Sequence, residues 1–163
     1  MRREALIAIG VLPAAVFAAA QGAIDITSSL AQPPSTSWPT YNGDYSGRRF
    51  SPLTAVNDGN VSGLSLAWVY RTNAGGTAGG GSIKSTPLQD RGVLYVTVPD
   101  HVWAIDARTG RELWHFPWPS SGGNHLANRG VALLGDWLYV ETPDTQFVVV
   151  AAADTVWSFV MNH

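Results

Sequence analysis

The sequence predicts an all-β chain, a partial β-propeller of about two four-stranded blades. The first observation is a repeat: residues 94–107 recur in degraded form at 138–151, at a constant offset of 44 residues. A period in the forties, composed of strand-forming and turn-forming residues, is typical of a propeller blade. The second observation is composition, because only 13% of the 163 residues are charged while Gly (17), Pro (10) and Trp (7) are abundant. This mixture favours short strands joined by tight turns.

The first 20 residues are predicted to be a signal peptide. Arg2 and Arg3 precede an apolar run from 5 to 20, and the alanines at its end form an A-x-A-like cleavage site. The alternative is a membrane anchor, but a span usually needs about 20 apolar residues, and no later stretch is long and apolar enough. We therefore expect an exported protein with no stable membrane span, a linker at 21–37 and an incomplete propeller domain at 38–163.

The segment before the repeat has two parts. Residues 38–53 combine turn formers with scattered aromatic side chains, which indicates an irregular segment packed onto a larger body by its rings. The stretch 64–72 is predicted to be a strand, because Leu66, Trp68 and Tyr70 recur at a period of two.

The next residues are typical of one complete blade of antiparallel sheet. Pro87 limits the first strand to an edge or a strand end, and turn residues separate the others. The expected strands are 83–88, 93–98, 101–106 and 111–116, with turns at 90–92, 99–100 and 107–110. Trp68 and Trp114 each follow a Leu near a strand end, and we interpret both as packing residues between blades.

The second blade begins at Val131 and then loses the pattern. A turn is expected at 135–136, a strand at 137–142, a turn at 143–144 and a strand at 147–151. Beyond that point, the tail to His163 no longer resembles a blade.

Charge and side-chain chemistry exclude several functions. The net charge of −2 indicates no general attraction to nucleic acid or anionic lipid. The absence of cysteine excludes disulfides and thiolate sites. The four histidines show no metal-ligand spacing, and the Asp residues of the repeat lie in or beside turns, where Asp bonds locally. No catalytic or metal-binding residue is therefore predicted.

Four groups of motifs, in order, carry a resemblance to a known family. They are Trp38–Asp44 with Arg49–Leu53; Leu66–Trp68; Ser85–Leu88 with Gly92–Val96 and the string Ala-Ile-Asp-Ala-Arg-Thr-Gly-Arg-Glu-Leu-Trp at 104–114; and Asn128–Ala132. Together they resemble the dehydrogenases of alcohols and glucose that depend on pyrroloquinoline quinone (PQQ).

The resemblance implies a fold, a reaction and a set of partners. The expected architecture is an eight-bladed propeller, with PQQ near its axis and a calcium ion beside the quinone. The implied reaction removes a hydride from an alcohol or sugar hydroxyl in the periplasm and passes electrons to a periplasmic acceptor.

The resemblance also implies site residues. The Arg of the Asn-Arg-Gly motif contacts the cofactor in the family, so Arg129 is the first cofactor-binding candidate, and a guanidinium suits the carboxylates of PQQ. Thr142 is a further family position near the cofactor. Lys84 stands where many members carry an acidic residue, and it is expected to meet a carboxylate or quinone oxygen. Gly123 and Asn124 replace an adjacent cysteine pair of many members. His125 beside them either faces the cofactor or is a solvated loop residue.

The two blades of this sequence do not include the blades that carry the family's catalytic residues. The resemblance places the catalytic Asp and the calcium ligands in later blades, so we expect an N-terminal fragment, produced by truncation or a frameshift, that is inactive alone. One alternative is a non-enzymatic repeat module that acts as a protein-binding or assembly scaffold. Another is the assembly of several copies into a closed propeller through unpaired strand edges.

Overall fold

The computed structural model describes residues 34–72, 83–121, 128–153 and 158–161 of the chain. The predicted signal peptide and most of the predicted linker lie outside these residues. Within the described part, no helix is both long and apolar enough to cross a membrane.

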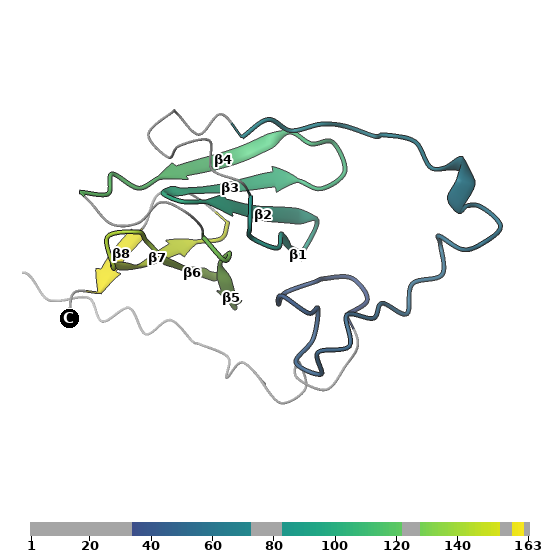
Figure 1. Cartoon of the computed structure of the whole chain (residues 1–163), viewed down its shortest axis with the longest axis horizontal. Helices are drawn as coiled ribbons and strands as arrows, with labels where there is room; N and C mark the ends of the chain where they lie inside the picture. Colours follow the sequence, from purple (N-terminus) through teal and green to yellow (C-terminus); the bar gives the residue numbers. More distant parts are fainter. Residues whose placement is uncertain (1–33, 73–82, 122–127, 154–157, 162–163) are drawn as a thin grey trace, which may run out of the picture.

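Two antiparallel sheets of four strands each form the body of the protein (Figure 1). Each sheet follows the chain order without a crossover, as expected of strands joined by hairpins. The first sheet contains β1 (Leu88–Asp90), β2 (Val93–Val98), β3 (His101–Asp106) and β4 (Glu112–Pro117), and the second contains β5 (Ala132–Leu134), β6 (Trp137–Glu141), β7 (Phe147–Ala151) and β8 (Ser158–Met161). The all-β expectation and the division into two blades are confirmed.

The tail of the chain corrects the sequence interpretation. The repeat motif was expected to fade before the end of a second blade, yet β8 pairs with β7 from Phe147↔Met161 to Val150↔Ser158. The physical reason is that a ladder is made by backbone groups, so a strand can form after the motif residues have been lost. The second blade therefore has the same strand order as the first.

The main core lies between the two sheets. Leu88, Val102 and Ala104 from the first sheet meet Leu138 and Val148 from the second, and all are at most 3% exposed. The Trp114 indole belongs to this core and donates a 3.3 Å hydrogen bond to the carbonyl oxygen of Ala152. Trp114 is thus a packing residue between blades, as predicted.

The other face of the first sheet is covered by an extended arm, residues 64–72. Trp103 and Ile105 are each 2% exposed on this face, and the half-buried rings of Trp68 and Tyr70 pack against their cluster. The Trp68 indole donates a 3.2 Å hydrogen bond to the carbonyl oxygen of Ala107. Trp68 therefore packs against the first sheet itself.

The predicted strand at 64–72 is wrong. The arm is extended, but it forms no ladder with any described strand. An alternating pattern favours an extended backbone, whereas a strand also requires a neighbouring sheet edge. Of the predicted face, Trp68 and Tyr70 pack inward while Leu66 is 78% exposed.

The first strand also begins later than predicted. Residues 83–87 precede β1, which starts at Leu88 immediately after Pro87. Proline has no N–H to donate to a ladder. The outer side of β1 pairs instead with Trp38, whose N–H donates to the carbonyl oxygen of Gln89 at 2.6 Å. The segment 34–45 is held at the sheet by this bridge.

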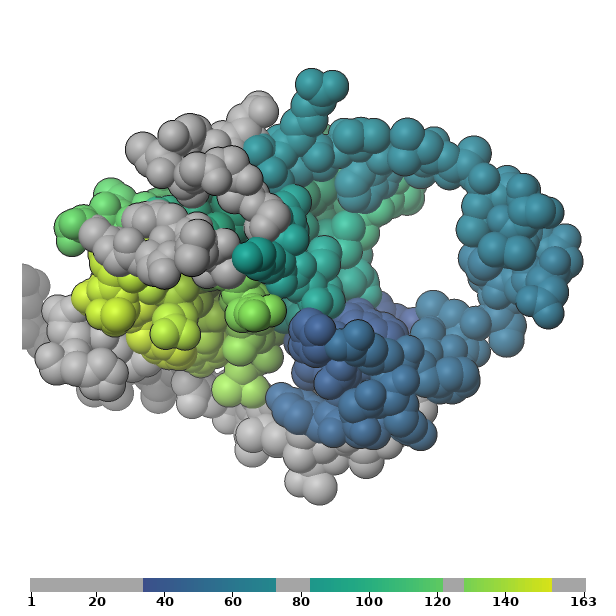
Figure 2. All heavy atoms as spheres, viewed as in Figure 1, coloured from purple at the N-terminus to yellow at the C-terminus, as the bar shows by residue number. Residues whose placement is uncertain are grey.

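Between that bridge and the arm, the chain leaves the sheets. Figure 2 shows this stretch, coloured blue to teal, as an arch that stands away from the body. It contains the short 3₁₀ helix η1 (Val61–Gly63) and many exposed apolar side chains. Across residues 45–69, which include part of the arm, the most exposed large apolar side chains are Tyr45, Leu53, Leu64, Leu66 and Val69, each at least 63% exposed.

The two blades differ by one residue in a hairpin. Val98 pairs with His101 across the two-residue turn at 99–100. In the second blade, the Thr142 N–H donates to the carbonyl oxygen of Gln146 across three residues, 143–145. The constant offset of 44 therefore holds for β2 and β6, whereas β7 matches β3 at 45, as the ladder pairs Tyr95↔Ala104 and Tyr139↔Val149 show.

Candidate functional site

The predicted site residues lie at one end of the two sheets, here called the site end. Lys84 precedes β1, Arg129 precedes β5 and Thr142 follows β6. Because β5 and β6 are antiparallel, with Ala132 opposite Tyr139, the start of one lies beside the end of the other. Topology alone therefore brings Arg129 and Thr142 close together.

A pocket of about 280 Å³ joins two of the three candidates. It lies between the segment that enters β5 and the hairpin that follows β6. Its lining residues are Asn128, Arg129, Gly130, Glu141, Thr142, Pro143 and Thr145. Arg129 and Thr142 thus share one pocket.

Lys84 does not line this pocket, but its segment approaches the pocket closely. A Cβ atom placed on Gly130 would lie 3.7 Å from the Ser85 Cβ and 3.6 Å from the Thr86 carbonyl oxygen. Gly130 itself has a φ of +114°, in a region that side chains rarely adopt. The structure therefore places the segment of Lys84 beside that of Arg129, with Lys84 exposed.

Arg129 is an exposed cation at the rim of the pocket. Its guanidinium makes no hydrogen bond or ion pair with any residue in the described ranges. By contrast, Arg91 and Arg48 are both engaged by carboxylates. A planar guanidinium with unused donors binds a carboxylate through two parallel hydrogen bonds. The rim is therefore suited to an anionic ligand.

Thr142 is 6% exposed and its hydroxyl has protein partners. It donates to the Asp144 carboxylate and accepts a 3.0 Å hydrogen bond from the Gln146 N–H. The Thr142 hydrogen bond is also the largest effect holding the pKa of Asp144 below its ordinary value, with help from the Trp118 indole. Thr142 shapes the hairpin that forms one wall of the pocket.

Three residues that sequence reasoning did not single out connect the site end. Thr97, Asn128 and Ser85 form hydrogen bonds across segments far apart in the chain, including one of 2.7 Å from the Thr97 hydroxyl to the Asn128 side-chain oxygen. Asn128 was visible only as part of the Asn-Arg-Gly motif. The sole sequence signal for Thr97 was its polarity, because it lies in a predicted strand made mostly of apolar residues. In the structure, Thr97 is 1% exposed.

The structure does not test the sequence expectations for three residues. Gly123, Asn124 and His125 lie outside the described residues. Among the residues that are described, no group of three or more His, Asp or Glu side chains could hold a metal ion.

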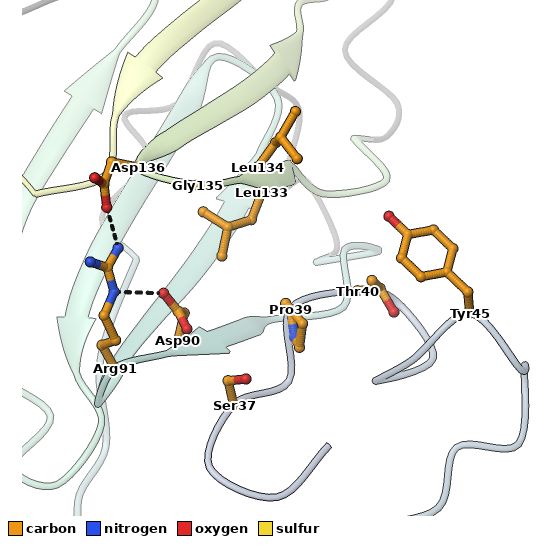
Figure 3. A pocket seen from close by; sticks show the side chains of 10 residues that line it. All are labelled: Ser37, Pro39, Thr40, Tyr45, Asp90, Arg91, Leu133, Leu134, Gly135 and Asp136. Carbon is orange, nitrogen blue, oxygen red and sulfur yellow. Dashed lines mark hydrogen bonds and ion pairs between the residues drawn. The ribbon is translucent and has the colours of Figure 1, made fainter. Parts of the chain in front are cut away.

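A larger pocket, of about 410 Å³, lies at the opposite end of the sheets (Figure 3). There Arg91, in the β1–β2 turn, forms ion pairs of 2.8 Å with Asp90 and 2.6 Å with Asp136 of the β5–β6 turn. Leu133, Leu134 and side chains of the segment 37–45 complete the lining. None of the predicted site residues lies here, and its one arginine is already paired.

These observations define a class of protein: a propeller-type chain of four-stranded blades with an exposed arginine at the rim of a pocket at one end. A family model described as the glucose/ethanol/alcohol dehydrogenase β-propeller domain, of the PQQ type, matches residues 38–158. The chain belongs to this family of PQQ-dependent dehydrogenases.

Similar proteins agree with that assignment. The quinohemoprotein alcohol dehydrogenase of Comamonas testosteroni is 36% identical over 152 residues, covering 86% of this chain and 20% of that protein. A 1-butanol dehydrogenase (cytochrome c) of Thauera butanivorans is 32% identical, with 71% of this chain and 17% of that protein covered.

The fold is also found among solved structures. The crystal structure of the Comamonas enzyme matches with a TM-score of 0.66 and 33% identity, over 82% of this chain and 20% of that one. The chain thus spans about a fifth of the length of these relatives.

Proposed function

We propose that this chain forms the opening blades of an exported, periplasmic PQQ-dependent dehydrogenase that oxidises an alcohol or sugar hydroxyl. The observation that carries the proposal is Arg129, an exposed guanidinium with no partner among the described residues, on the rim of a polar pocket. PQQ carries several carboxylates, so the residues present fit its anionic edge. The names of the relatives support alcohol as the substrate class and a cytochrome c as the acceptor.

The residues of the site end would have distinct tasks. Arg129 would bind a carboxylate of the cofactor, and Lys84 would add a second positive charge from the neighbouring segment. Thr142 would hold the hairpin wall against which the cofactor lies. The bound quinone, with calcium beside it, would supply the acceptor for the hydride of the substrate.

Cofactor binding is tested by titrating PQQ into the purified chain and measuring tryptophan fluorescence. Arg129→Gln is expected to weaken binding by at least tenfold, because a charge-assisted hydrogen-bond pair contributes about 1.5–3 kcal/mol. Arg108→Gln is the matched control, since Arg108 is an exposed arginine in the turn after β3, at the opposite end of the sheets. Equal affinities of both variants for PQQ would overturn the role of Arg129.

We further infer that the chain alone does not turn over substrate. No described residues form a metal-binding cluster, and in the family resemblance the catalytic residues belong to later blades. Dye reduction with added PQQ, calcium and an alcohol should remain at the level of a protein-free control. A rate above that control which depends on Arg129 would show that these blades are sufficient.

A scaffold function keeps one supporting observation, the exposed apolar side chains of the arch and the arm between residues 53 and 69. Exposed apolar patches of this kind mark surfaces that another protein covers. A stoichiometric partner recovered from the periplasm, and lost when Leu64 and Leu66 are replaced by serine, would favour this function. It would not by itself explain why Arg129 has no partner among the described residues.

A further inference from the structure

We propose that Thr97 and Asn128 are positioning residues for Arg129. A chain of hydrogen bonds runs from Ser85 through Thr97 and Asn128 to the backbone of Glu141, and it holds the segments of the site end at a fixed spacing. The inference rests on the proposed function, because it explains how the cofactor-binding rim is built.

The chain of hydrogen bonds reaches each predicted site residue through its neighbour in sequence. Ser85 follows Lys84, Asn128 precedes Arg129, and Glu141 precedes Thr142. The three site segments enter β1, enter β5 and leave β6, so no single hairpin connects all three. The side-chain network makes this connection.

The Asn128 amide is the centre of the network. Its oxygen accepts hydrogen bonds of 2.7 Å from the Thr97 hydroxyl and 2.7 Å from the Gly130 N–H. Its nitrogen donates a 3.1 Å bond to the Glu141 carbonyl oxygen. Both lone pairs of the oxygen are therefore used, together with one of the two N–H donors. This arrangement permits only one orientation of the side chain.

The bond from Gly130 explains why the network acts on Arg129 in particular. Asn128 and Gly130 flank Arg129, so the hydrogen bond between them closes a turn around its backbone. Arg129 has no side-chain partner in the described ranges, and therefore its direction depends on that backbone turn. Removing the Asn128 side chain should let the Arg129 guanidinium change direction without changing its charge.

Thr97 fixes the turn to the first sheet. Its side chain is 1% exposed in β2, and its backbone carbonyl oxygen accepts a 2.7 Å bond from the Ser85 hydroxyl. A buried hydroxyl needs a partner, since an unsatisfied one costs about 1–3 kcal/mol. Asn128 is that partner, so the sheet and the rim stabilise each other.

Thr97→Val tests the inference, because valine keeps the shape and removes the hydroxyl. PQQ affinity is expected to fall about tenfold, corresponding to a hydrogen bond of about 1.4 kcal/mol. Tyr95→Phe is the control: it also removes a hydroxyl, bonded at 3.3 Å to the Ala152 carbonyl oxygen between the sheets. It should lower stability while leaving the affinity unchanged. A similar loss of affinity in both variants would reduce Thr97 to a structural role and overturn the inference.

A double-mutant cycle with Arg129→Gln separates an effect of Asn128 on the position of Arg129 from a general loss of order in the site end. If Asn128 acts through Arg129, Asn128→Ala weakens PQQ binding in the unaltered chain and has no further effect beside Arg129→Gln. Additive losses would overturn the inference and leave the role of Arg129 intact. Unchanged binding in Arg129→Gln alone would instead overturn the proposed function.

Amide hydrogen exchange tests the network without the cofactor. Thr97→Val should increase the exchange rate of Gly130 and of residues 141–142 several-fold, whereas Tyr95→Phe should not. Unchanged exchange at the site end would overturn the inference. Increased exchange in a chain that binds no PQQ would support the network while contradicting the proposed function.

Discussion

At the scale of single residues, the packing of the arm depends on a glycine, because this position has no side chain. Gly110 ends the turn between β3 and β4 with a φ of +73°, and the Trp68 indole occupies the space beside it. A Cβ atom there would lie 2.6 Å from a carbon of the ring. The close approach lets the arm cover Trp103 and Ile105.

Gly110→Ala should therefore lower the free energy of unfolding by about 2–4 kcal/mol. The estimate combines about 1 kcal/mol for an L-residue at positive φ with about 1–3 kcal/mol for overpacking. Gly92→Ala is the matched control, because Gly92 has a φ of +81° but no atom within 4 Å of the added Cβ. Urea unfolding of the two variants compares the costs, and equal losses would show that the Trp68 contact does not contribute.

The residues of the site differ in how far the sequence could predict them. Arg129 belongs to a motif, and Arg129 and Thr142 line the same pocket, as a common site requires. Their cofactor-binding role stays a prediction. Thr97 and Asn128 are 31 positions apart, and their contact exists only because the segment that precedes β5 lies beside the end of β2. A hydrogen bond between distant residues leaves no periodic pattern to detect.

At the scale of elements, the β3–β4 ladder carries a pair of histidines. Nδ1 of His101 and Nε2 of His115 are 2.9 Å apart, and the His115 ring stacks on Trp103 with centroids 4.7 Å apart. One ring donates and the other accepts, so the pair cannot keep this bond when both are doubly protonated. Burial is the main cause that lowers the pKa of both side chains, and the charge of His115 lowers the pKa of His101 further. Asp100 opposes the shift at His101, and Glu112 opposes it at His115.

This pair should make stability depend on pH. Because the pKa of each His is lower in the folded than in the unfolded chain, the unfolded chain binds protons first. The contribution is complete above the unfolded value of 6.5 and is lost as the pH falls below it. His115→Gln should therefore reduce the fall in melting temperature between pH 7.5 and 5.5. A slope identical to that of the unaltered chain would contradict this role.

The elements themselves were predicted best where the pattern and the ladder coincide. The strands at 93–98, 101–106 and 147–151 have the predicted bounds. The stretch 64–72 has the same alternation, but it lies on a sheet face rather than at an edge. Alternation describes which side chains face inward, whereas pairing depends on a neighbour that sequence reasoning cannot place.

At the scale of the whole molecule, the two sheets are equivalent and so are their faces. Val148 and Val150 of β7 face the first sheet, and the ladder offset of 45 relates them to Trp103 and Ile105 of β3. The face of the first sheet that lies under the arm thus corresponds to the face through which the second sheet packs on the first. On the far side of the second sheet, Tyr139, Phe147 and Val149 are half-buried.

The chain is expected to associate in solution, because it exposes apolar side chains. Leu64, Leu66 and Val69 of the arm are each at least 63% exposed, and exposed apolar side chains favour association. Light scattering should show a mass that increases with concentration, and serine at all three positions should reduce the increase. An unchanged tryptophan spectrum would confirm that the sheets of this variant are intact. A monomer at every concentration would exclude the assembly of several copies.

The extra residue in the second hairpin has a consequence for how a repeated architecture acquires a site. The two blades have the same strand order and therefore nearly the same backbone. The turn at 99–100 in the first blade lines neither of the two pockets described above. The three-residue turn adds Thr145, with a φ of +63°, and its Pro143 and Thr145 line the pocket beside Arg129. One inserted residue thus breaks the symmetry of the repeat beside Arg129, a positive charge that has no partner in the described part of the chain. Duplication supplies the framework, and a local irregularity makes one copy chemically different from the other.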